Sequence, residues 1–269
     1  MLIFEDFIVR VFVAGILLGI ISGPMGSLVM WQKKAYFGDS LAHSAILGIA
    51  VSLFLSLDSN ITILCILVLF ALLLFIIENK SSIPSDTILG VMAHSSVGFG
   101  IVLLSLKEGI NFDLEAILFG DILSVSKQDL FYLFISSFII LILIKIFWQK
   151  LILIALSKSL AQAEYGNKVN NIKLIFIFML TLFIGLNVKI VGILIINAML
   201  LISAVSAKQI SKSPLEMAIF GSIIACISVF FGMMSSYYID LPVGASIVCC
   251  LSLIFFLISL AKFIYSRLG

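Results

Sequence analysis

Long apolar runs separated by short polar connections make up most of the chain. A helix needs roughly 20 apolar residues to cross the hydrocarbon core of a bilayer, and nine runs come near that length. Glycines around Pro24 predict a break in the first run, and the division between the sixth and seventh runs at 187–189 stays open. The pattern therefore predicts eight or nine membrane-spanning helices, at residues 7–30, 38–57, 60–78, 87–106, 130–148, 172–187, 190–207, 214–235 and 243–264.

The composition indicates a membrane protein without a soluble domain. Of the 269 residues, 62% are hydrophobic and only 11% are charged, too few to cover a soluble domain of this size. Glu5 and Asp6 stand where a cleavable signal peptide carries basic residues, so we expect the first run to be retained. The predicted fold is an all-α polytopic bundle with broken or re-entrant segments, forming one membrane-embedded domain over 1–269. A net charge of +2 gives no sign of a nucleic-acid partner.

Basic residues in the short connections predict the orientation of the chain. Lysine and arginine are enriched in cytoplasmic loops. With nine spans, nearly all basic connections fall on one side, which places the N-terminus outside and the C-terminus in the cytoplasm; Lys189 is the exception. The residues that mark the cytoplasmic side are Lys33, Lys34, Lys80, Lys150, Lys158, Lys168, Lys173, Lys208, Lys212, Lys262 and Arg267.

Two connections are longer than a turn. The acidic segment 107–129 contains an apolar stretch at 114–123 that is too short to span, which predicts a surface or re-entrant helix on the outer side. The segment 149–171 contains a short polar stretch that predicts an exposed cytoplasmic helix ending at Gly166.

The stretch 36–43 brings a carboxylate and an imidazole into an apolar run. Asp39 and His43 are four residues apart, so on a helix they lie on the same face. Carboxylate oxygen and imidazole nitrogen together suit a divalent transition metal ion, and ionisable groups inside lipid usually serve a function. The alternative for Asp39 is a helix cap. The pair is expected near the cytoplasmic end of its helix, unless 23–37 is re-entrant and brings it toward the midplane.

His94 is the other histidine of the chain, and it has no acidic neighbour at helical spacing. We expect it to serve as an additional metal ligand or in a hydrogen-bonded packing or relay role. Asp121 is expected to be a solvated loop carboxylate, with attraction of cations at the outer mouth as the alternative. The sequence has no His-Glu-x-x-His motif, which disfavours a metalloprotease, and the few polar residues within the spans disfavour other membrane enzymes.

No phosphate-binding G-x-x-x-x-G-K-[ST] loop is present, so transport driven by ATP would need a separate ATPase chain. The rival is a self-sufficient secondary transporter that uses a proton gradient, with Asp39 or His43 as the proton carrier.

Six blocks, in this order over nearly the whole chain, resemble the membrane permease of the ATP-driven zinc and manganese importers. Ala-His-Ser around His94 is most similar to the zinc-uptake branch. The blocks are GPMGS at 23–27, YFGDSLAH at 36–43, DTILGVMAHS at 86–95, LFGDILSV at 118–125, KIVGILIINAML at 189–200 and PVGASIV at 242–248.

The resemblance implies a homodimeric permease that moves Zn²⁺, or alternatively Mn²⁺, with no permanently bound cofactor. It also implies an ABC ATPase on the cytoplasmic side and an extracytoplasmic metal-binding protein. The family's metal-contacting acid and histidine fall on Asp39 and His43. Its ATPase-coupling helix falls on the segment 157–170, with the coupling residues Leu160, Ala161, Ala163, Glu164 and Gly166.

Two positions depart from the family pattern. Where the family usually has a proline followed by small residues, this chain reads SAVSA at 203–207, and the missing proline removes an expected kink. Tyr165 stands directly before Gly166, where the family more often carries small residues or valine, so the coupling assignment also depends on topology.

Overall fold

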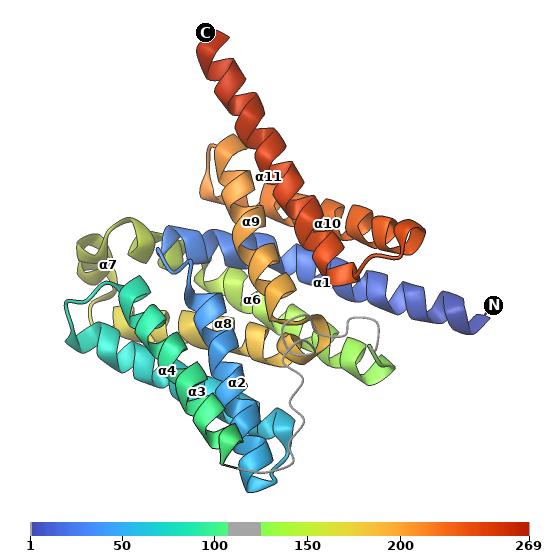
Figure 1. Ribbon diagram of the computed structural model, residues 1–269. Coiled ribbons are helices and arrows are strands. Elements are labelled where there is room, and N and C mark those ends of the chain that lie inside the picture. The colour runs from blue at the N-terminus through green and yellow to red at the C-terminus, as the bar shows by residue number, and fades with distance from the viewer. Residues whose placement is uncertain (1, 107–124, 269) are drawn as a thin grey trace.

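The computed structural model describes residues 2–106 and 125–268, and every regular element in these ranges is an α-helix (Figure 1). Eight helices in the described ranges are long and apolar enough to cross a membrane, which confirms the predicted polytopic all-α fold. The predicted short helix at 114–123 and Asp121 lie outside the described residues. The helices are α1 (Leu2–Trp31), α2 (Phe37–Leu55), α3 (Ser59–Lys80), α4 (Ser85–Ser105), α6 (Lys127–Leu156), α7 (Lys158–Tyr165), α8 (Lys168–Val191), α9 (Ile193–Ile210), α10 (Pro214–Ile239) and α11 (Val243–Leu268).

Side-chain caps fix where several helices begin. The Asp58 carboxylate accepts a hydrogen bond of 3.0 Å from the backbone N–H of Ile61 at the start of α3. Ser126 and Asp129 form a reciprocal capping box at the start of α6. Because the first backbone N–H groups of a helix have no partner within it, these side chains stabilise the ends that the apolar pattern alone leaves undefined.

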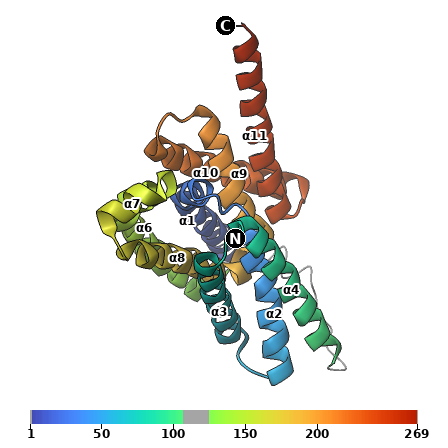
Figure 2. The same cartoon turned by 90° about the vertical axis from the view of Figure 1, so that its left-hand side faces the viewer.

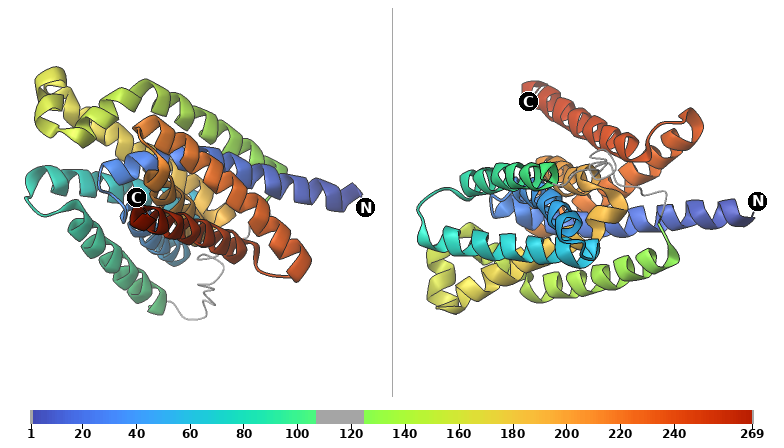
Figure 3. Two further views of the ribbon diagram at one scale, coloured as in Figure 1. Left: turned by 90° about the horizontal axis from the view of Figure 1, so that it is seen from above. Right: turned by 60° about the horizontal axis from the view of Figure 1, so that its bottom comes forward.

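Helix α1 lies at the centre of the bundle and α11 at its edge. In the apolar 18-residue stretch that could span the membrane, 67% of α1 is buried inside the protein, whereas only 11% of the corresponding stretch of α11 is buried. Helices α6 and α10 both pack on α1, and Figure 3 shows them along its two sides. The group of α2, α3 and α4 extends on one side of α1, and α11 projects on the other (Figures 1 and 2). Helix α9 contacts α1, α2, α8, α10 and α11 and therefore joins the two parts.

The predicted break near Pro24 is wrong, because α1 runs without interruption from Leu2 to Trp31. Proline has no N–H, so the carbonyl of Ile20, four residues earlier, loses its helical partner. The Ser222 hydroxyl of α10 donates a hydrogen bond of 2.7 Å to this Ile20 carbonyl oxygen. A side chain from a neighbouring helix thus satisfies the freed acceptor, which is how membrane helices tolerate proline.

The nearby glycines allow close helix packing instead. A Cβ at Gly26 would lie 2.0 Å from the Leu200 carbonyl oxygen of α9, a backbone atom that moves only with its helix. We expect Gly26→Ala to cost about 1–3 kcal/mol of unfolding free energy because α1 and α9 must separate. Thermal unfolding of the detergent-solubilised protein measures this loss. Gly90→Ala in α4 is the control, since no atom lies within 4 Å of its added Cβ; equal stability of the two variants would contradict the explanation.

The division between the sixth and seventh predicted runs lies at Gly192, not at 187–189. Helix α8 continues to Val191, and Asn187 stays within it because its amide donates a hydrogen bond of 2.6 Å to the Phe183 carbonyl oxygen. Gly192 has φ 80°, a conformation that residues with a Cβ rarely adopt. The chain therefore changes direction at this glycine, and the following α9 has only 18 residues and is not among the eight candidate spans.

Basic residues from separate connections lie near one another and near a carboxylate. Lys34 forms an ion pair with Glu78 of α3, with 2.5 Å between Nζ and Oε1. Lys34, Glu78 and Lys158 are close enough to Lys173 for their charges to act on it. This common location fits the predicted cytoplasmic side of these connections, although the side itself stays a prediction.

Candidate metal site and coupling helix

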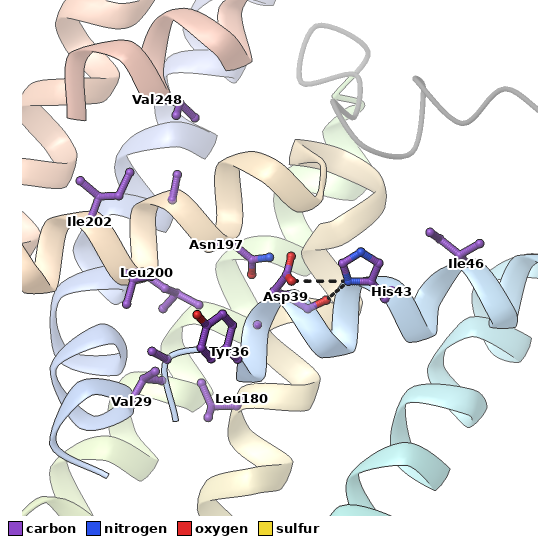
Figure 4. Close-up of a pocket in the computed structure, with 14 residues that line it drawn as sticks. Val29, Tyr36, Asp39, His43, Ile46, Leu180, Asn197, Leu200, Ile202 and Val248 are labelled. Carbon is purple, nitrogen blue, oxygen red and sulfur yellow. Dashed lines mark hydrogen bonds and ion pairs between the residues drawn. The ribbon is translucent and has the colours of Figure 1, made fainter. Parts of the chain in front are cut away.

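Serines of α2 lie close to polar groups of α4 where the two helices pack. The Ser40 hydroxyl donates to the Tyr36 carbonyl oxygen at 2.8 Å and lies 3.1 Å from the Leu89 carbonyl oxygen of α4. The Ser44 and Ser96 hydroxyls are 3.2 Å apart, and each also donates to a carbonyl oxygen of its own helix. With this face of α2 held against α4, the face that carries Asp39 turns toward α9 (Figure 4).

Asp39 and His43 form a pair, as the sequence predicts. Asp39 Oδ2 lies 3.6 Å from His43 Nδ1. The Asp39 side chain is 56% exposed and the His43 side chain 33% exposed, so an ion outside the protein core can reach both. Asp39 lies in the first turn of α2, where its charge also favours the helix dipole, but no capping bond from its side chain begins the helix. The N-cap position is Tyr36.

The hydrogen bonding of His43 leaves one ring nitrogen free. Nδ1 lies 2.8 Å from the backbone carbonyl oxygen of Asp39. A proton on Nδ1 donates to this oxygen and leaves the lone pair of Nε2 available. Metal-binding histidines commonly use this arrangement, in which a backbone carbonyl fixes the tautomer and ring orientation. The lone pair of Nε2 is then unshared, which is the state in which an imidazole nitrogen can act as a ligand.

The pair lines a cavity of about 430 Å³ between α1, α2, α8, α9 and α11 (Figure 4). Four of its lining residues carry polar side chains, namely Tyr36, Asp39, His43 and Asn197. The rest of the wall is apolar or glycine: Val29, Ala35, Gly38, Ile46, Leu180, Ala198, Leu200, Leu201, Ile202 and Val248. A few polar side chains in an otherwise apolar wall are typical of a small-ligand binding site.

His94 is not part of this cavity. Its side chain is exposed on α4, and it is not among the lining residues. Within 2–106 and 125–268, no group of three or more His, Cys, Asp and Glu side chains is arranged to hold a metal ion. The structure therefore brings together two of the three predicted ligands, and a ligand role for His94 stays a prediction.

Helix α7 forms where the sequence predicts a short helix. The Ser157 hydroxyl accepts a hydrogen bond of 3.3 Å from the backbone N–H of Leu160, and the helix ends at Gly166, which has φ 54°. Ala161 is fully buried, and Tyr165, one turn later, packs against the core. The other predicted coupling residues, Leu160, Ala163, Glu164 and Gly166, are exposed.

Tyr165 is bulkier than the residues that the family usually has before this glycine, yet it still packs against the core of the bundle. Its half-buried ring is accommodated beside Ala161 on the inner face. A side-chain hydrogen bond with Glu164 raises the pKa of Tyr165 above its ordinary value, and burial and the charge of Glu164 act in the same direction. The exposed face of α7 is therefore formed by Leu160, Ala163 and Glu164, which are three and four residues apart.

The profile of the ABC 3 transport family matches residues 4–262 of the chain. The chain belongs to this family. As an ABC 3 permease with eight apolar candidate spans in the described ranges, it is a multi-pass protein of the plasma membrane. It is a transport subunit and not an enzyme.

Individual relatives cover most of the chain. It is 36% identical over 226 residues to the high-affinity zinc uptake system membrane protein ZnuB of Haemophilus influenzae. This alignment covers 84% of this chain and 86% of that protein. It is 27% identical over 236 residues to the manganese transport system membrane protein MntC of Listeria monocytogenes, with coverages of 88% and 84%. Among solved structures, PsaBC from Streptococcus pneumoniae in complex with Fab matches with a TM-score of 0.79 and 29% identity, over 94% of this chain and 90% of that chain.

Asn197 is the cavity residue to which the sequence analysis assigned no role. It lies within the block 189–200, which resembles the family, but nothing in that resemblance gives Asn197 a role of its own. The sequence signal that points to it is an amide side chain in the otherwise apolar run that follows Gly192. Its closeness to Asp39 depends on how α9 packs on α2, which no local pattern reveals.

Proposed function

We propose that this ABC 3 permease is the membrane subunit of an ATP-driven importer that carries Zn²⁺ into the cytoplasm. The observation that carries the proposal is the accessible Asp39–His43 pair in the wall of a cavity in a chain of this family. The zinc-uptake relative is 36% identical, whereas the manganese-transport relative is 27% identical, which favours zinc. Imidazole is a better ligand for zinc than for manganese, and carboxylate suits both.

Asp39 and His43 supply an oxygen and a nitrogen to the ion, which is cargo and not a resident cofactor. Zinc is usually held by four ligands at a structural site. Two ligands from one chain form an incomplete shell, so water or a second copy of the permease completes it. An incomplete shell suits transport, because a conducted ion must bind selectively and still leave. His94, exposed on α4, needs a second copy or another conformation to reach the ion.

Three protein partners are part of the proposal. An ABC ATPase docks on the exposed face of α7 and supplies the energy, since no phosphate loop occurs in this sequence. An extracytoplasmic metal-binding protein delivers the ion. A second copy of the permease forms the other half of the pathway, while the lipid of the membrane covers the remaining apolar surface.

Energy dependence separates the importer from the proton-coupled alternative. In cells that express this chain with its ATPase and binding protein, we expect uptake of radioactive zinc to stop when ATP is depleted and to continue when an uncoupler collapses the proton gradient while ATP is maintained. Competing manganese at equal concentration is expected to inhibit weakly. Uptake that follows the proton gradient in ATP-depleted cells would overturn the proposal.

A further inference from the structure

Asn197 is a half-buried amide residue in the wall that faces the Asp39–His43 pair. It lies on α9, and Figure 4 shows its side chain beside the Asp39 carboxylate. Its Oδ1 atom is shielded from solvent and makes no hydrogen bond with any residue in the described ranges. A buried acceptor without a donor is uncommon and destabilising, so its retention in an apolar wall needs an explanation.

Close packing holds this amide next to the metal-binding end of α2. A Cβ at Gly38 would lie 2.2 Å from Asn197 Oδ1, so only glycine leaves room for the amide at this position. Gly38 directly precedes Asp39 in the chain. The amide is therefore fixed against the turn of helix that presents the carboxylate, although it comes from a distant part of the sequence.

The orientation of the amide group is not set by a hydrogen bond at Oδ1. Because Oδ1 makes no hydrogen bond with the described residues, no bond at that atom is broken when the amide group rotates. A half-turn exchanges Oδ1 with Nδ2, two groups of nearly the same size, and directs the oxygen toward the cavity. In that orientation the cavity presents a carboxylate oxygen, an imidazole nitrogen and a neutral amide oxygen.

We propose that Asn197 is a specificity-determining residue whose amide oxygen is a third ligand for the ion held by Asp39 and His43. The inference rests on the proposed function, because it assumes that the cavity receives the transported ion. A neutral oxygen adds affinity without adding charge, so it strengthens binding while the ion stays able to leave. An added oxygen ligand helps manganese relatively more than zinc, because imidazole already favours zinc.

Two variants of Asn197 test the ligand role through metal preference. Asn197→Leu keeps the size and removes the oxygen, and we expect the KM for zinc uptake to rise about ten-fold, with a larger rise for manganese. Asn197→Asp keeps the shape and adds a charged oxygen, and we expect the ratio of zinc to manganese uptake to shift about ten-fold toward manganese. Both KM values are measured in cells with radioactive metals, at membrane levels checked by immunoblot.

Asn187→Leu is the matched control, because Asn187 Oδ1 is also buried without a partner in the described ranges but does not line the cavity. Its zinc-to-manganese ratio is expected to stay at the wild-type value. An unchanged ratio in both Asn197 variants would overturn the inference, as would an equal loss for the two metals in Asn197→Asp, which is the result of a purely positioning role. If uptake still depends on Asp39 in those experiments, the proposed function survives; if uptake is indifferent to Asp39, the proposed function itself fails.

Discussion

Cells that carry Asp39→Ala or His43→Ala in place of the native chain are expected to lose zinc uptake while the protein stays in the membrane at normal levels. Even the loss of an indirect, outer-shell partner lowers metal affinity about 10–100-fold, so the loss of a direct ligand is expected to reduce uptake at least that much. The Asp39 side chain is 56% exposed, so its truncation removes little packing, whereas His43 is 33% exposed and its truncation removes more. Uptake at low zinc concentration and membrane levels in the same cells are the two measurements.

Conservative substitutions sharpen this test. Asp39→Asn keeps the shape of the side chain and removes its charge, and we expect it to resemble Asp39→Ala. Asp58→Ala is the control, because that carboxylate caps α3 and is expected to cost about 1 kcal/mol of stability without changing uptake. Wild-type uptake by either the Asp39 or the His43 variant would remove both residues from the ion pathway.

Local sequence patterns were sufficient where structure depends on near neighbours. Asp39 and His43 share a face because they are one helical turn apart. Helix α7 begins after the Ser157 cap and ends at Gly166, both of which lie next to the helix in sequence. Predictions of this kind need no knowledge of the rest of the fold.

Long-range contacts decided the cases that the sequence left open or predicted wrongly. Pro24 does not break α1, because Ser222, about 200 positions later, bonds to the freed Ile20 carbonyl oxygen. Asn197 reaches Gly38 only through the packing of α9 on α2. His94 carries a ligand-type side chain but lies outside the cavity. In each case, helix periodicity says which face a residue occupies but not which helix lies opposite.

Leu160→Glu on the exposed face of α7 is expected to abolish ATP-driven uptake by releasing the ATPase. Leu160 is 61% exposed on a helix outside the membrane spans, so an apolar side chain there is available to a partner. A central contact of this kind typically contributes about 2 kcal/mol or more to binding, which is on the order of 30-fold in affinity. Recovery of the ATPase with the purified permease measures the effect.

The two faces of α7 make this experiment specific. Ala161 is fully buried and anchors the helix to the bundle, whereas Leu160 makes its contacts on the outside, so a charge at Leu160 leaves the fold intact. Gln162→Glu adds the same charge at an exposed position of the same helix that is not one of the named coupling residues, and we expect it to retain the ATPase. Undiminished ATPase recovery and uptake with Leu160→Glu would mean that the ATPase binds elsewhere. If Leu160→Glu loses the ATPase but still binds metal, the ion site and the coupling helix act at separate steps. That result is expected, because no residue of α7 lines the cavity.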